Sequence, residues 1–112
     1  MENVPVKPNA SLVTGTVRCL QRPAPGAQQP VLELLVRRAE DVESLANFAA
    51  ADVGNTIAIK LRGKMREGWP ALQDYVRLRV EFRGDEWGGG YYANAEDLEA
   101  ADSLVGDEDQ GR

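Results

Sequence analysis

The chain has a basic segment whose residue types suit contact with an anionic polymer. Residues 54–83 contain seven Lys or Arg against three Asp or Glu, a net charge of +4. Side chains of a strand alternate between its faces, so residues 75–83 would carry apolar groups on one face and mainly arginine on the other. Proteins that bind single strands combine such basic faces with aromatic platforms for bases. The candidate binding residues are Lys60, Arg62, Lys64, Arg77, Arg79, Arg83, Trp87 and Tyr91.

Other features weigh against a strong nucleic-acid binder. Alternating arginines often form only a solvated face, whose long aliphatic stems cover apolar surface. Tyr91 and Tyr92 point to opposite faces of a strand, so one of them must face the core. Acidic side chains also repel phosphate, and three of them lie near the expected contact surface: Glu33, Asp85 and Glu86.

Catalytic and metal chemistry find little support in the sequence. The chain has no histidine, the commonest general base and transition-metal ligand. Cys19 lies in a predicted strand, where we expect it to pack as a small apolar residue. The glycine-rich segment 84–90 lacks the lysine and Ser/Thr of a phosphate-binding loop. We therefore expect a protein that is not an enzyme and that uses no cofactor and no metal.

The composition also suggests a compartment. A single cysteine cannot form an intrachain disulfide, and the N-terminal residues lack the apolar run of a secretory signal. No stretch approaches the roughly 18 apolar residues of a spanning helix. We expect a cytoplasmic protein with no membrane partner. The overall charge of −5 is concentrated in residues 96–112, where seven acids and one base give −6 and leave +1 for residues 1–95.

Period-two alternation predicts strands at residues 56–62 and 75–83. The β-rich composition of residues 11–21 and the nearly continuous apolar run of residues 31–38 predict two more, and a fifth strand is expected to start at Tyr91. Gly15 suggests a bulge or a bend. Segment 39–55 fits a helix or a loop with turns, and a short helix is expected near Pro70. Residues 95–104 either extend the fifth strand or form a short helix capped by Asn94. The predicted core comprises Val13, Val17, Leu34, Ile57, Ile59, Leu61, Leu78, Val80 and Phe82.

These elements suggest one domain, at residues 11–104, between an extended N-terminal segment (1–10) and a disordered acidic tail (105–112). Their order resembles the OB-fold, a five-stranded Greek-key barrel, with a short helix between strands 3 and 4. Gly15, that helix and the last hairpin ending in Tyr91-Tyr92-Ala93 carry the resemblance, which matches no specific OB family. Another small barrel or an open α+β sheet are the alternatives.

The resemblance implies a mainly β barrel in which nucleic acid lies across strands two and three, between the first and last hairpin loops. With the basic residues, this predicts a non-enzymatic OB-like binding module that contacts single-stranded DNA or RNA with modest affinity. The alternative is a protein-interaction or structural module, acting as a homo-oligomer or as a subunit of a larger assembly. The acidic residues near the expected groove favour this alternative.

Overall fold

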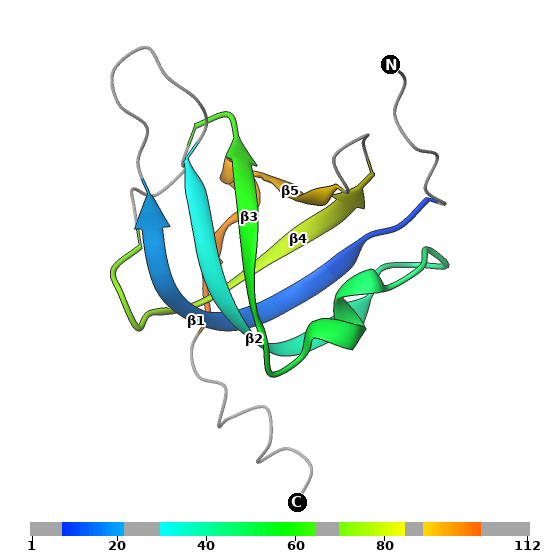
Figure 1. The fold of residues 1–112 in the computed structure, drawn as a ribbon, viewed down its shortest axis with the longest axis horizontal. Helices are drawn as coiled ribbons and strands as arrows, with labels where there is room; N and C mark the ends of the chain where they lie inside the picture. The colour runs from blue at the N-terminus through cyan, green and yellow to red at the C-terminus, as the bar shows by residue number, and fades with distance from the viewer. Residues whose placement is uncertain (1–7, 22–29, 65–69, 85–88, 102–112) are drawn as a thin grey trace, which may run out of the picture.

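Strands form where the chain alternates apolar and polar residues or is rich in apolar and β-branched ones. The computed structural model describes residues 8–21, 30–64, 70–84 and 89–101 (Figure 1). Trp87, the first hairpin loop and the predicted acidic tail therefore lie outside the described residues. The strands are β1 (Ser11–Gln21), β2 (Val31–Asp41), β3 (Thr56–Arg62), β4 (Tyr75–Arg83), β5 (Gly90–Asn94) and β6 (Glu99–Ala100).

The first five strands close into a barrel. Their order is β1-β2-β3-β5-β4, and β1 pairs with β4 to close the ring. All pairings in this ring are antiparallel except β3 with β5, which run parallel. The two-residue β6 adds to β4 at Val76 and Arg77. This closed, mixed barrel confirms the predicted mainly β, OB-like fold.

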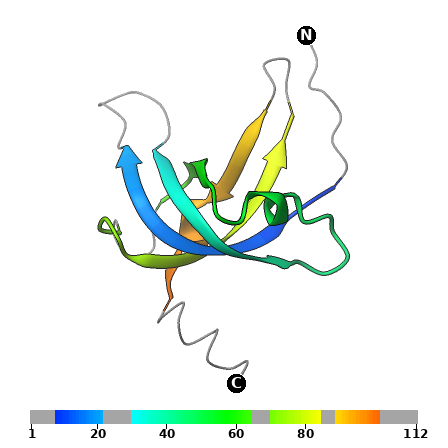
Figure 2. The same ribbon diagram turned by 60° about the horizontal axis from the view of Figure 1, so that its bottom comes forward.

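β1 pairs with both β2 and β4, and it curves strongly along its length (Figures 1 and 2). Its register against β2 shifts between Thr14 and Gly15 and again between Val17 and Cys19. A bulge of this kind bends a strand and increases its local twist. Gly15 has no room for a side chain, because a Cβ there would lie 2.8 Å from Leu34 Cγ and would overlap the Leu35 carbonyl oxygen. The bulge predicted at Gly15 is confirmed.

The core contains the inward residues of every barrel strand. Eight of the nine predicted core residues are buried, including Val13, Ile59 and Leu78. The ninth, Phe82, is half-buried and packs against the core near one end of the barrel. Its ring lies 5.8 Å from that of Phe48 and 5.3 Å from that of Tyr91, as an edge-to-face contact in the second case.

The segment between β2 and β3 covers that end of the barrel. β2 continues three residues beyond the predicted end, because Ala39–Asp41 pair with the start of β1. A turn then leads to the 3-10 helix η1 (Phe48–Asp52), whose Ala49 is fully buried in the core. Ser11 fixes η1 through a hydrogen bond from its hydroxyl to Asn47 Oδ1 (2.6 Å) and another from the Ala49 N–H (3.2 Å).

The short helix expected near Pro70 is not found in the described part of the β3–β4 connection, residues 63–64 and 70–74. Leu72 and Gln73 form a turn instead. The Gln73 N–H donates to the Val17 carbonyl (2.8 Å), and the Val17 N–H donates to the Asp74 carbonyl (2.9 Å). These bonds extend the β1–β4 pairing, so the backbone groups that a helix would use are taken by β1.

Candidate binding surface

One row of side chains crosses the outer face of three neighbouring strands. Lys60 on β3 is opposite Tyr92 on β5, and Tyr92 is opposite Glu81 on β4. The chain neighbours of all three residues include buried groups, such as Ile59 and Val80, so the row itself must face outward. The alternation therefore places these three side chains on the outer face of the barrel, and the pairing register makes them neighbours.

Tyr92 has three cationic side chains close to its ring. Lys60 Nζ lies 5.3 Å from the ring centroid, Arg83 Cζ lies 5.6 Å away and Arg62 Cζ lies 6.0 Å away. These distances are in the range of cation–π attraction, which contributes about 0.5–1 kcal/mol at exposed sites. Tyr92 therefore favours a close grouping of three like charges. We call Lys60, Arg62, Glu81, Arg83 and Tyr92 the Tyr92 cluster.

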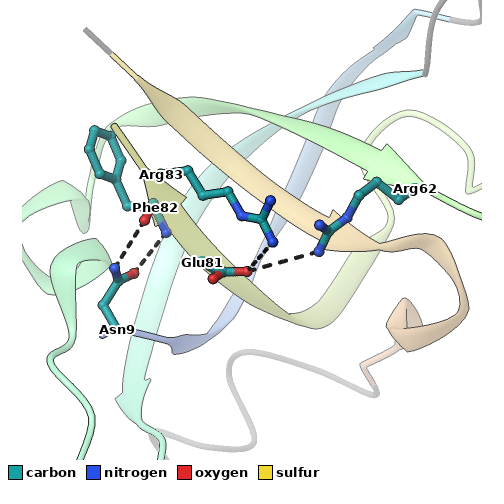
Figure 3. Close-up of polar contacts among 5 residues, drawn as sticks. All are labelled: Asn9, Arg62, Glu81, Phe82 and Arg83. Carbon is teal, nitrogen blue, oxygen red and sulfur yellow. Dashed lines mark hydrogen bonds and ion pairs between the residues drawn. The ribbon is translucent and has the colours of Figure 1, made fainter. Parts of the chain in front are cut away.

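Glu81 is the acidic member of the Tyr92 cluster. Its Oε1 lies 3.4 Å from Nη2 of Arg83 and 3.9 Å from Nη2 of Arg62 (Figure 3). All three side chains keep contact with solvent, with exposed fractions of 41% for Glu81, 52% for Arg83 and 31% for Arg62. Three cations and one carboxylate leave the cluster with a net charge of +2.

Asn9 anchors β4 directly beside Glu81 and Arg83. Its side-chain amide donates to the Phe82 carbonyl (3.0 Å), and its Oδ1 accepts from the Phe82 N–H (2.7 Å; Figure 3). The Asn9 side chain thus replaces a neighbouring strand, satisfying both backbone groups of Phe82. This contact fixes the backbone between two members of the Tyr92 cluster.

Tyr91 faces the opposite way from Tyr92. It is buried in the core, and its hydroxyl donates to Asp52 Oδ2 at 2.7 Å. Burial raises the pKa of the Tyr91 hydroxyl, and the hydrogen bond to Asp52 raises it further. Of the two neighbouring tyrosines that the sequence offered, Tyr91 thus supports the barrel end, while Tyr92 lies among the basic residues.

The other candidate residues are not members of the Tyr92 cluster, and Arg79, two residues before Glu81 on the same face of β4, is the nearest to it. Arg77 and Arg79 share the outer face of β4, but in the half that pairs with β1. Arg77 forms an ion pair with Glu99 on β6 (3.4 Å), and Arg79 is exposed. Arg77 stands six positions before Arg83, a span of about 20 Å along the strand. Lys64 is exposed just beyond the end of β3.

The β2–β3 face, where the OB resemblance places nucleic acid, is less basic. Glu33 lies opposite Ala58 on β3, and its Oε2 accepts a hydrogen bond from Gln21 Nε2 (3.2 Å). Val31 lies opposite Lys60. The three cations around Tyr92 therefore lie on β3 and β4, next to the expected face and further around the barrel.

Sequence reasoning missed two features of this surface. Tyr92 was not among the candidate residues, because alternation alone could not decide which tyrosine faces outward. Glu81 was recognised as an outward residue, but its contact with two arginines depends on the register across β3, β5 and β4. A signal for Glu81 did exist, since it stands two residues before Arg83 and therefore on the same face.

Comparisons of this chain with protein-family models, with curated proteins and with solved structures found no match. In the part of the chain that the structure describes, no three acidic or cysteine side chains gather into a group able to hold a metal ion. None of the helices among those residues has the length and apolar character needed to cross a bilayer. The interpretation of the surface therefore depends on its own geometry and charge.

Proposed function

We propose that this protein is a non-enzymatic, OB-like binding module that contacts single-stranded DNA or RNA through the outer face of β3, β5 and β4. The observation that supports this most is the grouping of Lys60, Arg62 and Arg83 around Tyr92. A grouped set of cations attracts a chain of phosphates, and arginine forks match phosphate geometry. Aromatic side chains among such cations are typical of surfaces that bind single strands, and Tyr92 is a half-buried one.

The proposed affinity is modest because the charge is small. Binding to a single strand releases counterions, and the logarithm of the association constant falls with the logarithm of salt by about 0.7 per phosphate neutralised. Three contacts from Lys60, Arg62 and Arg83 correspond to a slope of about −2. Participation of Lys64, Arg77 and Arg79, also predicted from the sequence, would raise the slope to about −4.

Substitution of Arg83 tests the proposal. In a fluorescence polarisation titration with a labelled single strand at about 20 mM salt, Arg83→Ala is expected to weaken binding about fivefold, the effect of one charge at about 4 Å in water. Arg37→Ala is the matched control, because Arg37 is an exposed arginine of β2. It stands six residues along β2 from Val31, the partner of Lys60. That separation is about 20 Å.

The Arg37→Ala control is expected to bind as the wild type does. If both variants lose the same affinity, the loss reflects the overall charge of the protein and counts against a defined binding surface. Absence of binding by the wild-type protein at this low salt would refute the proposed function. Running the titration with both DNA and RNA of the same sequence would also identify the preferred polymer.

Two exposed apolar side chains favour a second candidate, a homo-oligomer. Leu72 is 63% exposed and Tyr75 is 37% exposed, three residues further along the chain. Changing both to serine is expected to dissociate an oligomer measured by light scattering. Val53→Ser is the control, because Val53 is 48% exposed but follows η1 in a different connection. A wild-type protein that is monomeric across the concentration range would exclude this candidate.

A further inference from the structure

Two guanidinium groups of the Tyr92 cluster converge on a single oxygen atom. Nη2 of Arg62 and Nη2 of Arg83 both approach Glu81 Oε1, at 3.9 and 3.4 Å (Figure 3). These arginines come from different strands, β3 and β4, with β5 between them. A negatively charged oxygen at this point interacts with two cations at once.

The internal carboxylate is weakly held at this point. Glu81 and Arg83 are about half exposed, and ion pairs between such side chains add little to stability. Both contacts also exceed the 2.7–2.9 Å typical of a charge-assisted hydrogen bond. Arg83 thus donates only a long hydrogen bond to Glu81, and Arg62 lies further away, so neither arginine holds the carboxylate strongly.

We infer that Glu81 Oε1 occupies a phosphate position, and that a phosphodiester group of a bound strand takes this position by displacing the Glu81 side chain. This inference depends on the proposed function and specifies which ligand atoms the surface contacts. A phosphodiester oxygen carries the same kind of charge as the carboxylate, and the two arginine forks match phosphate geometry as hydrogen-bond donors. Glu81 thereby acts as a built-in competitor that weakens binding.

Tyr92 has a defined part in this arrangement. Its ring lies 5.6 Å from Arg83 Cζ and 6.0 Å from Arg62 Cζ, so it attracts both guanidinium groups without neutralising them. When Glu81 moves away, the ring still favours the grouping of the two arginines. The phosphate position therefore persists after its internal occupant leaves.

Removal of the Glu81 charge tests the inference. Glu81→Gln keeps the size of the side chain, and it is expected to tighten binding of a labelled single strand about fivefold at about 20 mM salt, as one charge at about 4 Å would. The salt slope is expected to steepen, because the variant releases no carboxylate that would take up a counterion when the phosphate binds. Thermal unfolding of the variant verifies that the barrel is intact.

Glu99→Gln is the matched control. Glu99 also forms an ion pair with an arginine of β4, at 3.4 Å from Arg77 Nε, and its side chain is 46% exposed. The substitution changes the net charge of the protein by the same amount. Because Arg77 lies about 20 Å along β4 from Arg83, one charge there contributes only about 0.2 kcal/mol in water, and the control is expected to tighten binding less than twofold.

The outcomes separate the two proposals. If Glu81→Gln leaves the affinity unchanged or lowers it, or if both variants tighten binding equally, the phosphate position is refuted. The proposed function survives that result if Arg83→Ala still weakens wild-type binding. If neither the wild type nor Glu81→Gln binds at low salt, both proposals fail. As a second readout, the side-chain Nε–H resonances of Arg62 and Arg83 are expected to shift together on adding the strand. No shift at saturating strand would also refute the position.

Discussion

Substitution of Gly15 by alanine tests how the barrel closes. Gly15 sits at the β1 bulge, where β1 pairs with Val36 of β2 on one side and with Val76 of β4 on the other. A Cβ at this position would lie 2.8 Å from Leu34 Cγ and 3.0 Å from the Leu35 carbonyl carbon, and would overlap the Leu35 carbonyl oxygen. Two of these three atoms belong to the backbone.

The expected cost follows from what must move. β2 is paired with both β1 and β3 at Leu35, so its backbone cannot shift without weakening one of the two ladders. Overpacking usually costs about 1–3 kcal/mol, and a clash with fixed backbone belongs at the upper end. The reduced freedom of the unfolded chain returns about 0.4–1 kcal/mol. We expect a net loss of about 2 kcal/mol, or roughly 10 °C in Tm for a domain of this size.

Gly90→Ala is the matched control. Gly90 also lies in a barrel strand, opposite Arg83, and none of the described atoms beyond its chain neighbours would lie within 4 Å of a Cβ there. We expect its unfolding free energy to stay within about 0.5 kcal/mol of the wild type or to rise slightly. Chemical denaturation followed by circular dichroism measures both variants. A Gly15→Ala protein as stable as the wild type, or equal losses in both variants, would refute the close packing at the bulge.

Three further changes test the core and its anchors. Ile59→Ala, in the fully buried centre of β3, is expected to cost about 2–5 kcal/mol in chemical denaturation, and a loss of a few tenths would contradict its burial. Asn9→Ala removes both hydrogen bonds to Phe82, and it is expected to cost about 1–2 kcal/mol of stability and to speed amide exchange at Phe82. Asn94→Ala is the control, because the Asn94 side chain makes no capping bond among the described residues, and it is expected to change neither the stability nor that exchange rate. The raised pKa of Tyr91 means that its folded form resists ionisation, so its contribution to stability is complete below about pH 10 and is lost above it. Tyr91→Phe is therefore expected to flatten the fall of unfolding free energy above that pH, and an unchanged pH profile would argue against the buried hydroxyl.

Much of the fold could be predicted because the strands carry clear period-two patterns. The predicted limits of β1, β3 and β4 agree with the structure, since β3 and β4 have apolar residues at alternate positions and β1 is rich in β-branched residues. The end of β2 was harder. Glu40 and Asp41 look like a helix start, yet pairing with Leu12 and Ser11 keeps them extended. Local propensity was overridden by partners 28 and 30 residues earlier in the chain.

The candidate surface was predictable only in part for the same reason. Alternation correctly placed Lys60, Arg62 and Arg83 on outward positions. Their grouping needs the parallel pairing of β3 with β5, which sets Lys60 against Tyr92. That pairing joins strands far apart in the sequence, so no local pattern records it. The choice of Tyr92 over Tyr91, and the position of Glu81 between two arginines, both follow from this register.

The salt dependence of single-strand binding tests the proposed binding surface most directly. Polarisation titrations from about 20 to 200 mM salt are expected to give a slope of about −2 for the wild type, from the three cations around Tyr92. Arg83→Ala is expected to reduce the slope to about −1.4, and Arg37→Ala to leave it unchanged. A wild-type slope near zero, or the same slope in the wild type and Arg83→Ala, would contradict a phosphate-binding surface on β3, β5 and β4.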